Sequence, residues 1–179
     1  MMLTPDLRDS LLQSIPSMRA FAVSLTGNVD QADDLVQEAM VRGLTYIQQF
    51  QPGTNIQAWL FTILRNQFHT LHRKRRREVE DPDGGLAARL CVLPEQEGYL
   101  ALQDLKAALT HLAVEQREAL LLVAAQGFSY EEAAEICGTR TGTIKSRVHR
   151  ARAELAELLG IENPEDIGAD RVFKASVHQ

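Results

Sequence analysis

The side chains best suited to chemistry are cations and small polar groups gathered in two clusters that contain no acid. Residues 65–77 hold six basic residues and residues 140–152 hold five, so the two clusters account for eleven of the nineteen Lys and Arg residues. The chain as a whole is acidic, with a net charge of −5. Two basic patches on an acidic body predict local binding of a polyanion. The alternative for each cluster is a solvated helix end.

The second cluster lies on a helix with a separate apolar face, because Ile144, Val148, Ala151 and Leu155 recur at helical spacing. A short helix and a turn at Gly138 precede it, which is the helix-turn-helix pattern. The opposite face is basic and hydroxylic: Thr143, Ser146, Arg147 and Arg150, flanked by Arg140, Lys145, His149 and Arg152. Arginine pairs with guanine and hydroxyls reach phosphates, so this face predicts major-groove binding. The alternative is a solvated helix of a bundle.

The first cluster continues a helix whose other face is apolar. Its exposed side is expected to carry Arg65, Asn66, His69, His72 and Arg73 and then Lys74, Arg75, Arg76 and Arg77, with Phe61 and Thr62 beside it. Cations, amides and an aromatic ring suit single-stranded nucleic acid, whose unstacked bases need π surfaces and polar edges. The alternative for Trp59 and Phe61 is a place in the core.

Other classes of protein fit less well. His69 and His72 are three residues apart, but no Cys or carboxylate joins them at helical spacing, so a metal site is not expected. No nucleophile–base group or phosphate-binding glycine loop occurs, which predicts neither an enzyme nor a cofactor. Cys91 and Cys137 form no disulfide framework, and no apolar run is long enough to span a membrane. A cytoplasmic protein with no membrane contact is expected.

The fold class that positions these clusters is all-α, with two small helical domains. The first (1–77) contains three helices, with Pro16 expected to bend or divide the first, and Leu44 and Leu71 expected on apolar faces. An acidic linker (78–94) follows, then a domain (95–160) with helices over 95–112, 114–126, 129–137 and 140–159, and a tail (161–179). Asn28 or Asp30 is expected to cap the second helix, and Ser129 with Glu132 to form a capping box.

The second helix is acidic on one exposed face. Asp34, Gln37 and Glu38 share that face at i, i+3 and i+4 spacing, where a basic partner helix could bind. Acids in a first turn also stabilise the helix dipole, which is the alternative explanation.

Three strings resemble an extracytoplasmic-function (ECF) sigma factor of bacterial RNA polymerase. DDLVQEA (33–39) is similar to region 2.2, NIQAWLFTILRNQFHTLHRKRRR (55–77) to regions 2.3 and 2.4, and TRTGTIKSRVHRARAEL (139–155) to region 4.2. The resemblance implies that Asp34, Gln37 and Glu38 contact the core enzyme, which includes the β and β′ subunits. It implies promoter −10 contacts by Asn55, Phe61, Arg65, Asn66, His69, Arg73, Lys74, Arg75 and Arg76. It implies −35 contacts by Arg140, Thr143, Lys145, Ser146, Arg147, His149 and Arg150.

Within that family, FTILRNQFHTLHRKRRRE resembles the general-stress sigma factors of alphaproteobacteria. This implies a small helical anti-sigma protein, removed by a response regulator with a sigma-like domain. In the family, the two domains without core polymerase can close either on each other or around an inhibitor, and both arrangements would hide the same surfaces. Two other classes remain: a sigma mimic that titrates an anti-sigma factor without binding DNA, and an ordinary helix-turn-helix repressor. Intact DNA-reading residues weigh against the first, and the DDLVQEA face is unexplained by the second.

Overall fold

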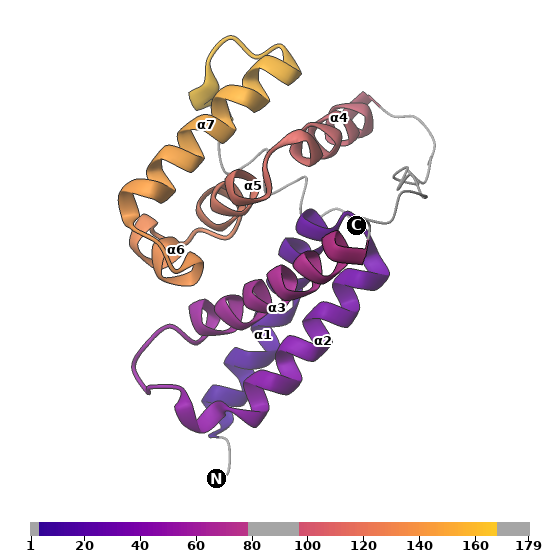
Figure 1. Ribbon diagram of the computed structural model, residues 1–179. Coiled ribbons are helices and arrows are strands. Elements are labelled where there is room, and N and C mark those ends of the chain that lie inside the picture. Colours follow the sequence, from indigo (N-terminus) through magenta and orange to yellow (C-terminus); the bar gives the residue numbers. More distant parts are fainter. Residues whose placement is uncertain (1–3, 79–96, 168–179) are drawn as a thin grey trace.

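The computed structural model describes residues 4–78 and 97–167, and within these ranges every regular element is helical. Figure 1 shows two groups of helices, α1–α3 and α4–α7, lying against each other. The expected linker (78–94) lies outside the described residues except for Glu78, and the tail is described only as far as Ile167. No helix in the described ranges is long and apolar enough to cross a bilayer.

The first unit is a bundle of α1 (Pro5–Thr26), α2 (Val29–Thr45) and α3 (Ile56–Glu78), with a short 3-10 turn, η1 (Ile47–Gln49), after α2. Asn28 caps α2, because its side-chain oxygen accepts a hydrogen bond from the Gln31 amide at 3.0 Å. The bundle encloses large apolar side chains that are fully buried, among them Met18, Phe21, Leu35, Leu60 and Leu64. Each helix therefore exposes the polar face opposite its apolar stripe.

The structure excludes a divided α1 and corrects the expectation for Leu44 and Leu71. The helix α1 is not divided at Pro16 but continues through it for more than two further turns. Proline removes one backbone hydrogen bond, and buried Leu11 and Met18 on either side hold both halves in the same core. Leu44 and Leu71 are exposed by 45% and 41%, because helical spacing indicates the apolar side of a helix but not how much of that side its neighbours cover.

The second unit contains α4 (Glu97–His111), α5 (Val114–Leu120) with its π-helical continuation η2 (Leu121–Ala125), α6 (Tyr130–Cys137) and α7 (Thr141–Leu159). A 3-10 turn, η3 (Pro164–Asp166), follows and leads to the buried Ile167. The capping box at α6 is confirmed: the Ser129 hydroxyl accepts from the Glu132 amide at 3.0 Å, and the Ser129 amide donates to the Glu132 carboxylate at 2.9 Å. Helix α6 ends at Gly138, whose φ of 60° favours glycine.

The two units share a continuous apolar core. Helix α3 packs against α6, and α1 packs against α5. Phe61 joins the two sides: its ring centroid lies 5.2 Å from that of Phe21 in α1 and 5.1 Å from that of Phe128 before α6. The conformation is therefore closed, with α5 and α6 covering part of α3 (Figure 1).

Candidate nucleic-acid and polymerase-binding surfaces

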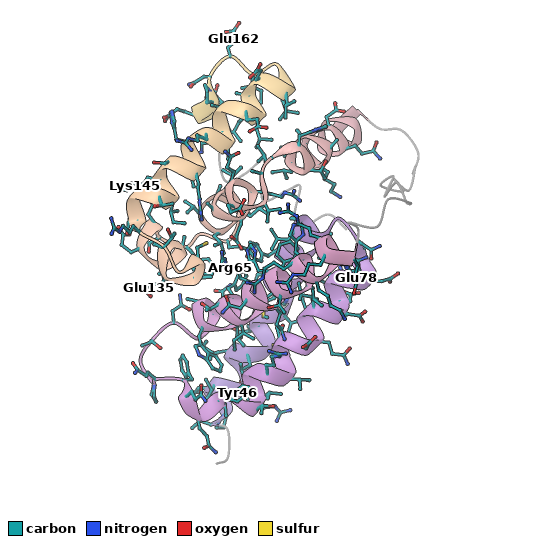
Figure 2. The ribbon with its side chains drawn as sticks, viewed as in Figure 1. Tyr46, Arg65, Glu78, Glu135, Lys145 and Glu162 are labelled. Carbon is teal, nitrogen blue, oxygen red and sulfur yellow. The ribbon has the colours of Figure 1, made fainter. Side chains whose placement is uncertain are left out.

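The basic face of α7 is built as its helical spacing predicts. Ile144, Val148, Ala151 and Leu155 are buried against α5 and α6, which leaves the other face toward solvent. Five of the predicted −35 residues are exposed and two, Thr143 and Arg147, are half-buried; the exposed ones are Arg140, Lys145, Ser146, His149 and Arg150. Lys145 lies at the outer edge of the molecule in Figure 2. Among the described residues, this face is therefore open to solvent.

The basic surface of α3 is only partly accessible. Asn66 and the run from Arg73 to Arg76 are exposed, whereas Arg65 and His69 are half-buried. Arg75 is tied to the start of α2, because its Nη1 donates to Gln31 Oε1 at 2.6 Å. Phe61 is fully buried, so its position is that of a core residue, the alternative that the sequence left open.

A carboxylate of the second unit explains why Arg65 and His69 are half-buried. Glu118 of α5 is fully buried, and its Oε1 lies 2.8 Å from Arg65 Nε and 3.0 Å from His69 Nε2. Figure 2 shows Arg65 at the junction of the two units. Its other oxygen, Oε2, has no hydrogen-bond partner within the described ranges. Two predicted DNA-binding residues therefore face an acid from the same chain.

The neighbouring residue, Arg117, binds the first unit at a second point. Its Nη1 lies 3.3 Å from the carbonyl oxygen of Leu25 and 3.4 Å from that of Ser24, both in the last turn of α1. Helix ends leave carbonyls without intrahelical partners and carry partial negative charge, so a guanidinium there is favourable. Burial lowers the pKa of Arg117, although a guanidinium stays protonated in a protein.

A third polar contact joins the units at the start of α3. The Asn55 side-chain amide donates to Glu132 Oε1 at 2.9 Å, and Glu132 is also the acid of the α6 capping box. The Asn55 bond, followed by the bond from the Ser129 amide, lowers the pKa of Glu132. Asn55, a predicted −10 residue, is thus engaged by α6.

Sequence reasoning missed the partners of these residues. Arg117 and Glu118 are adjacent charges in the apolar stretch VEQREALLLVAA, and both are buried, at 8% and 0% exposure. Charged residues are almost never fully buried unless they are paired, so charges within an apolar helix were the available signal. Neither their partners nor their distance from α3 follows from helical spacing.

The acidic face of α2 stays open in the closed conformation. Asp34, Gln37 and Glu38 are all exposed, and Glu38 pairs with Arg42 one turn later at 3.0 Å. Two exposed apolar side chains follow them in the sequence: Val41 on α2 and Tyr46 directly after its end. Charged and apolar groups side by side are the composition of a protein-binding surface.

A pocket of about 350 Å³ lies between α2 and α3 beside Asn66. It is lined by Glu38, Arg42, Tyr46, Ile63, Asn66, Gln67, Thr70 and Leu71. Gln67 is only 5% exposed, and neither its amide nitrogen nor its amide oxygen has a hydrogen-bond partner in the described part of the chain. An amide with a free donor and a free acceptor is suited to the polar edge of a nucleobase.

Burial shifts the pKa of two further residues, half-buried His72 of α3 and buried Cys137 of α6. Burial, with the charge of Arg76 second, lowers the pKa of His72, whose ring stacks on Phe68. Burial raises the pKa of Cys137 to about 12, so this thiol is unreactive. Among the described residues, no three His, Cys, Asp or Glu side chains gather as a metal site.

Known proteins match this chain over nearly its whole length. The Sigma-70 region 2 family matches residues 12–78, and the Sigma-70 region 4 family matches residues 102–155. The ECF RNA polymerase sigma factor EcfG of Rhodopseudomonas palustris is 56% identical over 177 residues, covering 99% of this chain and 98% of that protein. The ECF sigma factor SigE of Mycolicibacterium smegmatis is 37% identical over 150 residues, covering 80% of this chain and 58% of that protein.

One solved structure is similar to this chain both in fold and in sequence. The sigma factor RpoE of Bartonella quintana, crystallised with the anti-sigma factor NepR, matches with a TM-score of 0.80 and 49% identity. The match covers 89% of this chain and all of that one. With the two basic surfaces, the acidic face of α2 and these likenesses together, the chain belongs to the ECF RNA polymerase sigma factors.

Proposed function

We propose that this sigma factor divides promoter recognition between two domains, 1–77 and 95–160, joined by the segment 78–94. The acidic face of α2 binds core polymerase through Asp34, Gln37 and Glu38. The α3 surface captures the −10 strand, and the α7 face reads the −35 element. The observation that carries the proposal is the exposed basic face of α7, which lies on the side of the helix opposite its buried apolar stripe.

The −10 role rests on the features of α3. Asn66 and the cations from Arg73 to Arg76 are exposed along one helix, which suits the backbone of a single strand. The pocket beside Asn66, with the unpartnered amide of Gln67, is suited to an unstacked base. Asn55, Arg65 and His69 complete this surface once their partners in the second unit are removed.

In this proposal, the segment 78–94 limits how far apart the two DNA-binding domains can lie. A tether between two weak DNA-binding domains makes the second contact intramolecular, so affinity for a promoter depends on both elements being within reach. Core polymerase, bound to α2, then sets the distance between the domains. The acidic remainder of the chain repels DNA, which limits binding without polymerase.

Regulation by a small anti-sigma protein is part of the proposal, within a general stress response. The Bartonella relative was crystallised with the anti-sigma factor NepR, and the similarity covers 89% of this chain. A response regulator with a sigma-like domain would release this chain by taking the inhibitor. Titration of the purified sigma factor with a NepR-type protein should give a stable complex that no longer supports transcription.

The test of the main proposal is transcription in vitro with the purified chain and sigma-free bacterial core polymerase on a promoter library. Specific starts that share two upstream motifs are expected, and they would provide the recognition sequence. An active core and a folded chain that together yield no specific start would contradict the proposal. That result would favour a mimic that binds an anti-sigma factor and no DNA.

A further inference from the structure

We infer that Arg117 and Glu118 form an internal latch, in which Glu118 occupies the proposed strand-binding side chains Arg65 and His69 of α3 in place of nucleic-acid phosphate. This inference rests on the proposed role of α3. Release of the latch is then a step that precedes capture of the −10 strand.

The geometry of Glu118 is that of a competing anion. Its Oε1 is shared by Arg65 Nε at 2.8 Å and His69 Nε2 at 3.0 Å, which are distances that a phosphate oxygen would adopt with the same groups. The side chains of Arg65 and His69 are 15% and 23% exposed, and that of Glu118 is 0% exposed. No second anion reaches these atoms while the carboxylate is in place.

Arg117 fixes the position of this carboxylate. It is the preceding residue of α5, and its guanidinium contacts the Ser24 and Leu25 carbonyls at the end of α1. Two adjacent residues of α5 thus contact two helices of the first unit. Arg117 binds the negative C-terminal end of α1, and Glu118 binds two side chains of α3. Such paired contacts set the orientation of α5 on the bundle.

The latch is incompletely satisfied, which suits a contact that must open. Glu118 Oε2, Arg65 Nε and Arg117 Nε are buried without a well-aligned hydrogen bond in the described ranges, so the 2.8 Å approach of Arg65 Nε to Glu118 Oε1 is an ion pair with poor hydrogen-bond alignment. Taking charges out of water is costly, and imperfect pairing repays only part of that cost. Opening returns all four charged or polar side chains to water, so the closed state owes its stability to apolar contacts such as Phe61 with Phe128.

Closure covers part of the α3 surface but leaves the α2 and α7 faces exposed. The α2 face with Glu38 and the α7 face with Arg150 are exposed while Arg65 and His69 are engaged. Core polymerase can therefore bind the closed protein at α2, and separation of the domains on the polymerase then frees the α3 surface. The latch prevents strand binding by free sigma factor without hindering assembly.

The test compares the full chain with Glu118→Gln, which keeps the shape of the side chain and removes its charge. Glu135→Gln is the matched control, because Glu135 is exposed on α6 and the change in net charge is the same. Fluorophores on Val41→Cys and Leu158→Cys, both at exposed positions, report the distance between the units. Cys91 and Cys137 are replaced by alanine in every sample, because opening would expose the Cys137 thiol, which is buried in the closed conformation.

Glu118→Gln should lower energy transfer between the fluorophores, since the charge of Arg65 is then left unpaired in the closed state. Affinity of the free protein for a labelled single-stranded oligonucleotide of mixed sequence should rise about tenfold, because a larger fraction is open. Arg117→Met should also lower energy transfer through loss of the α1 contact. Circular dichroism melting establishes that each variant is folded.

Unchanged energy transfer in Glu118→Gln would overturn the latch, and so would a gain in affinity no larger than that of Glu135→Gln. Reduced energy transfer with unchanged affinity would show a structural contact that does not compete with nucleic acid, which also overturns the inference. Failure of the proposed function is distinguishable, because it would appear as wild-type holoenzyme that initiates at no promoter.

Discussion

The ring of Phe61 on α3 meets the ring of Phe128 edge-on, with centroids 5.1 Å apart and planes at 70°, across the boundary between the two units. Edge-to-face aromatic pairs at this spacing are favourable beyond the area that they bury. Both side chains are buried, at 0% and 5% exposure. A residue expected beside the −10 surface thus belongs, in the closed conformation, to the apolar contact that holds α5 and α6 over that surface.

The α7 face provides a direct test of −35 recognition. Arg147→Ala or Arg150→Ala should lower transcription from a −35-dependent promoter about tenfold, since one arginine contact to a base contributes about 1–3 kcal/mol. Binding to core polymerase should not change, because α2 is untouched. Glu157→Ala, on an exposed position of the same helix, is the control. Equal loss of core affinity would contradict the assignment.

The α2 face is tested by charge reversal. Glu38→Lys should weaken association with core polymerase, because it replaces an exposed acid that pairs with Arg42 by a second cation. The fold should be unaffected, since the side chain is exposed. Association is measured by titrating labelled sigma factor with core enzyme, with Glu157→Lys as the control. Holoenzyme assembly equal to wild type would remove Glu38 from the interface.

Replacement of Gln67 by an apolar residue should raise the stability of the fold and lower the strand-opening activity. Gln67→Leu removes two unpartnered polar atoms from a buried position, so the free energy of unfolding should rise by about 1–3 kcal/mol. Strand opening at a promoter, followed by permanganate reactivity of unpaired thymines, should fall because the pocket loses its amide. Asn66→Ala should lower opening without the gain in stability. A Gln67→Leu variant that opens promoters like wild type would contradict a role of the amide.

Close packing of α2 against α3 is tested at Gly43. A Cβ at this position would lie 2.9 Å from Leu60 Cδ2, and Leu60 is fully buried. Gly43→Ala should therefore destabilise the fold by about 1 kcal/mol or more, despite the better helix propensity of alanine. Gly142→Ala in α7 is the matched variant, because its Cβ meets no atom within 4 Å. It should gain up to about 1 kcal/mol. Chemical denaturation measures both.

Acid should weaken the Glu132 contacts in a defined direction. Folding lowers the pKa of Glu132 below its ordinary 4.5, chiefly through the Asn55 bond and then the Ser129 amide. The resulting stabilisation is present above the unfolded pKa and is lost as pH falls through the lower folded value. Wild type should therefore exceed Glu132→Gln in stability at neutral pH, and the difference should shrink below about pH 4.5. A difference independent of pH, or equal to that of Glu131→Gln, would contradict this.

Local patterns in the sequence were sufficient for most elements and for the exposed surfaces. Helical spacing predicts that Ile144 and Val148 are buried and that Arg150 faces solvent, and the structure confirms this. The residue types at Ser129 and Glu132 predict the capping box, which is also confirmed. These features depend on residues within one or two turns, so side-chain type and spacing are enough. Pro16 shows the limit of such reasoning, because core packing on both sides kept α1 continuous.

Contacts between distant segments required the folded structure. Glu118 with Arg65, Arg117 with Leu25, and Phe61 with Phe128 each join residues far apart in the chain. Helical spacing states which side of a helix is apolar, but not which other helix covers it or where a buried charge finds its partner. The exposed basic and acidic helix faces could therefore be predicted from the chain itself, whereas the closure of α5 and α6 over α3 arises from shared burial of apolar and charged groups that no local pattern encodes.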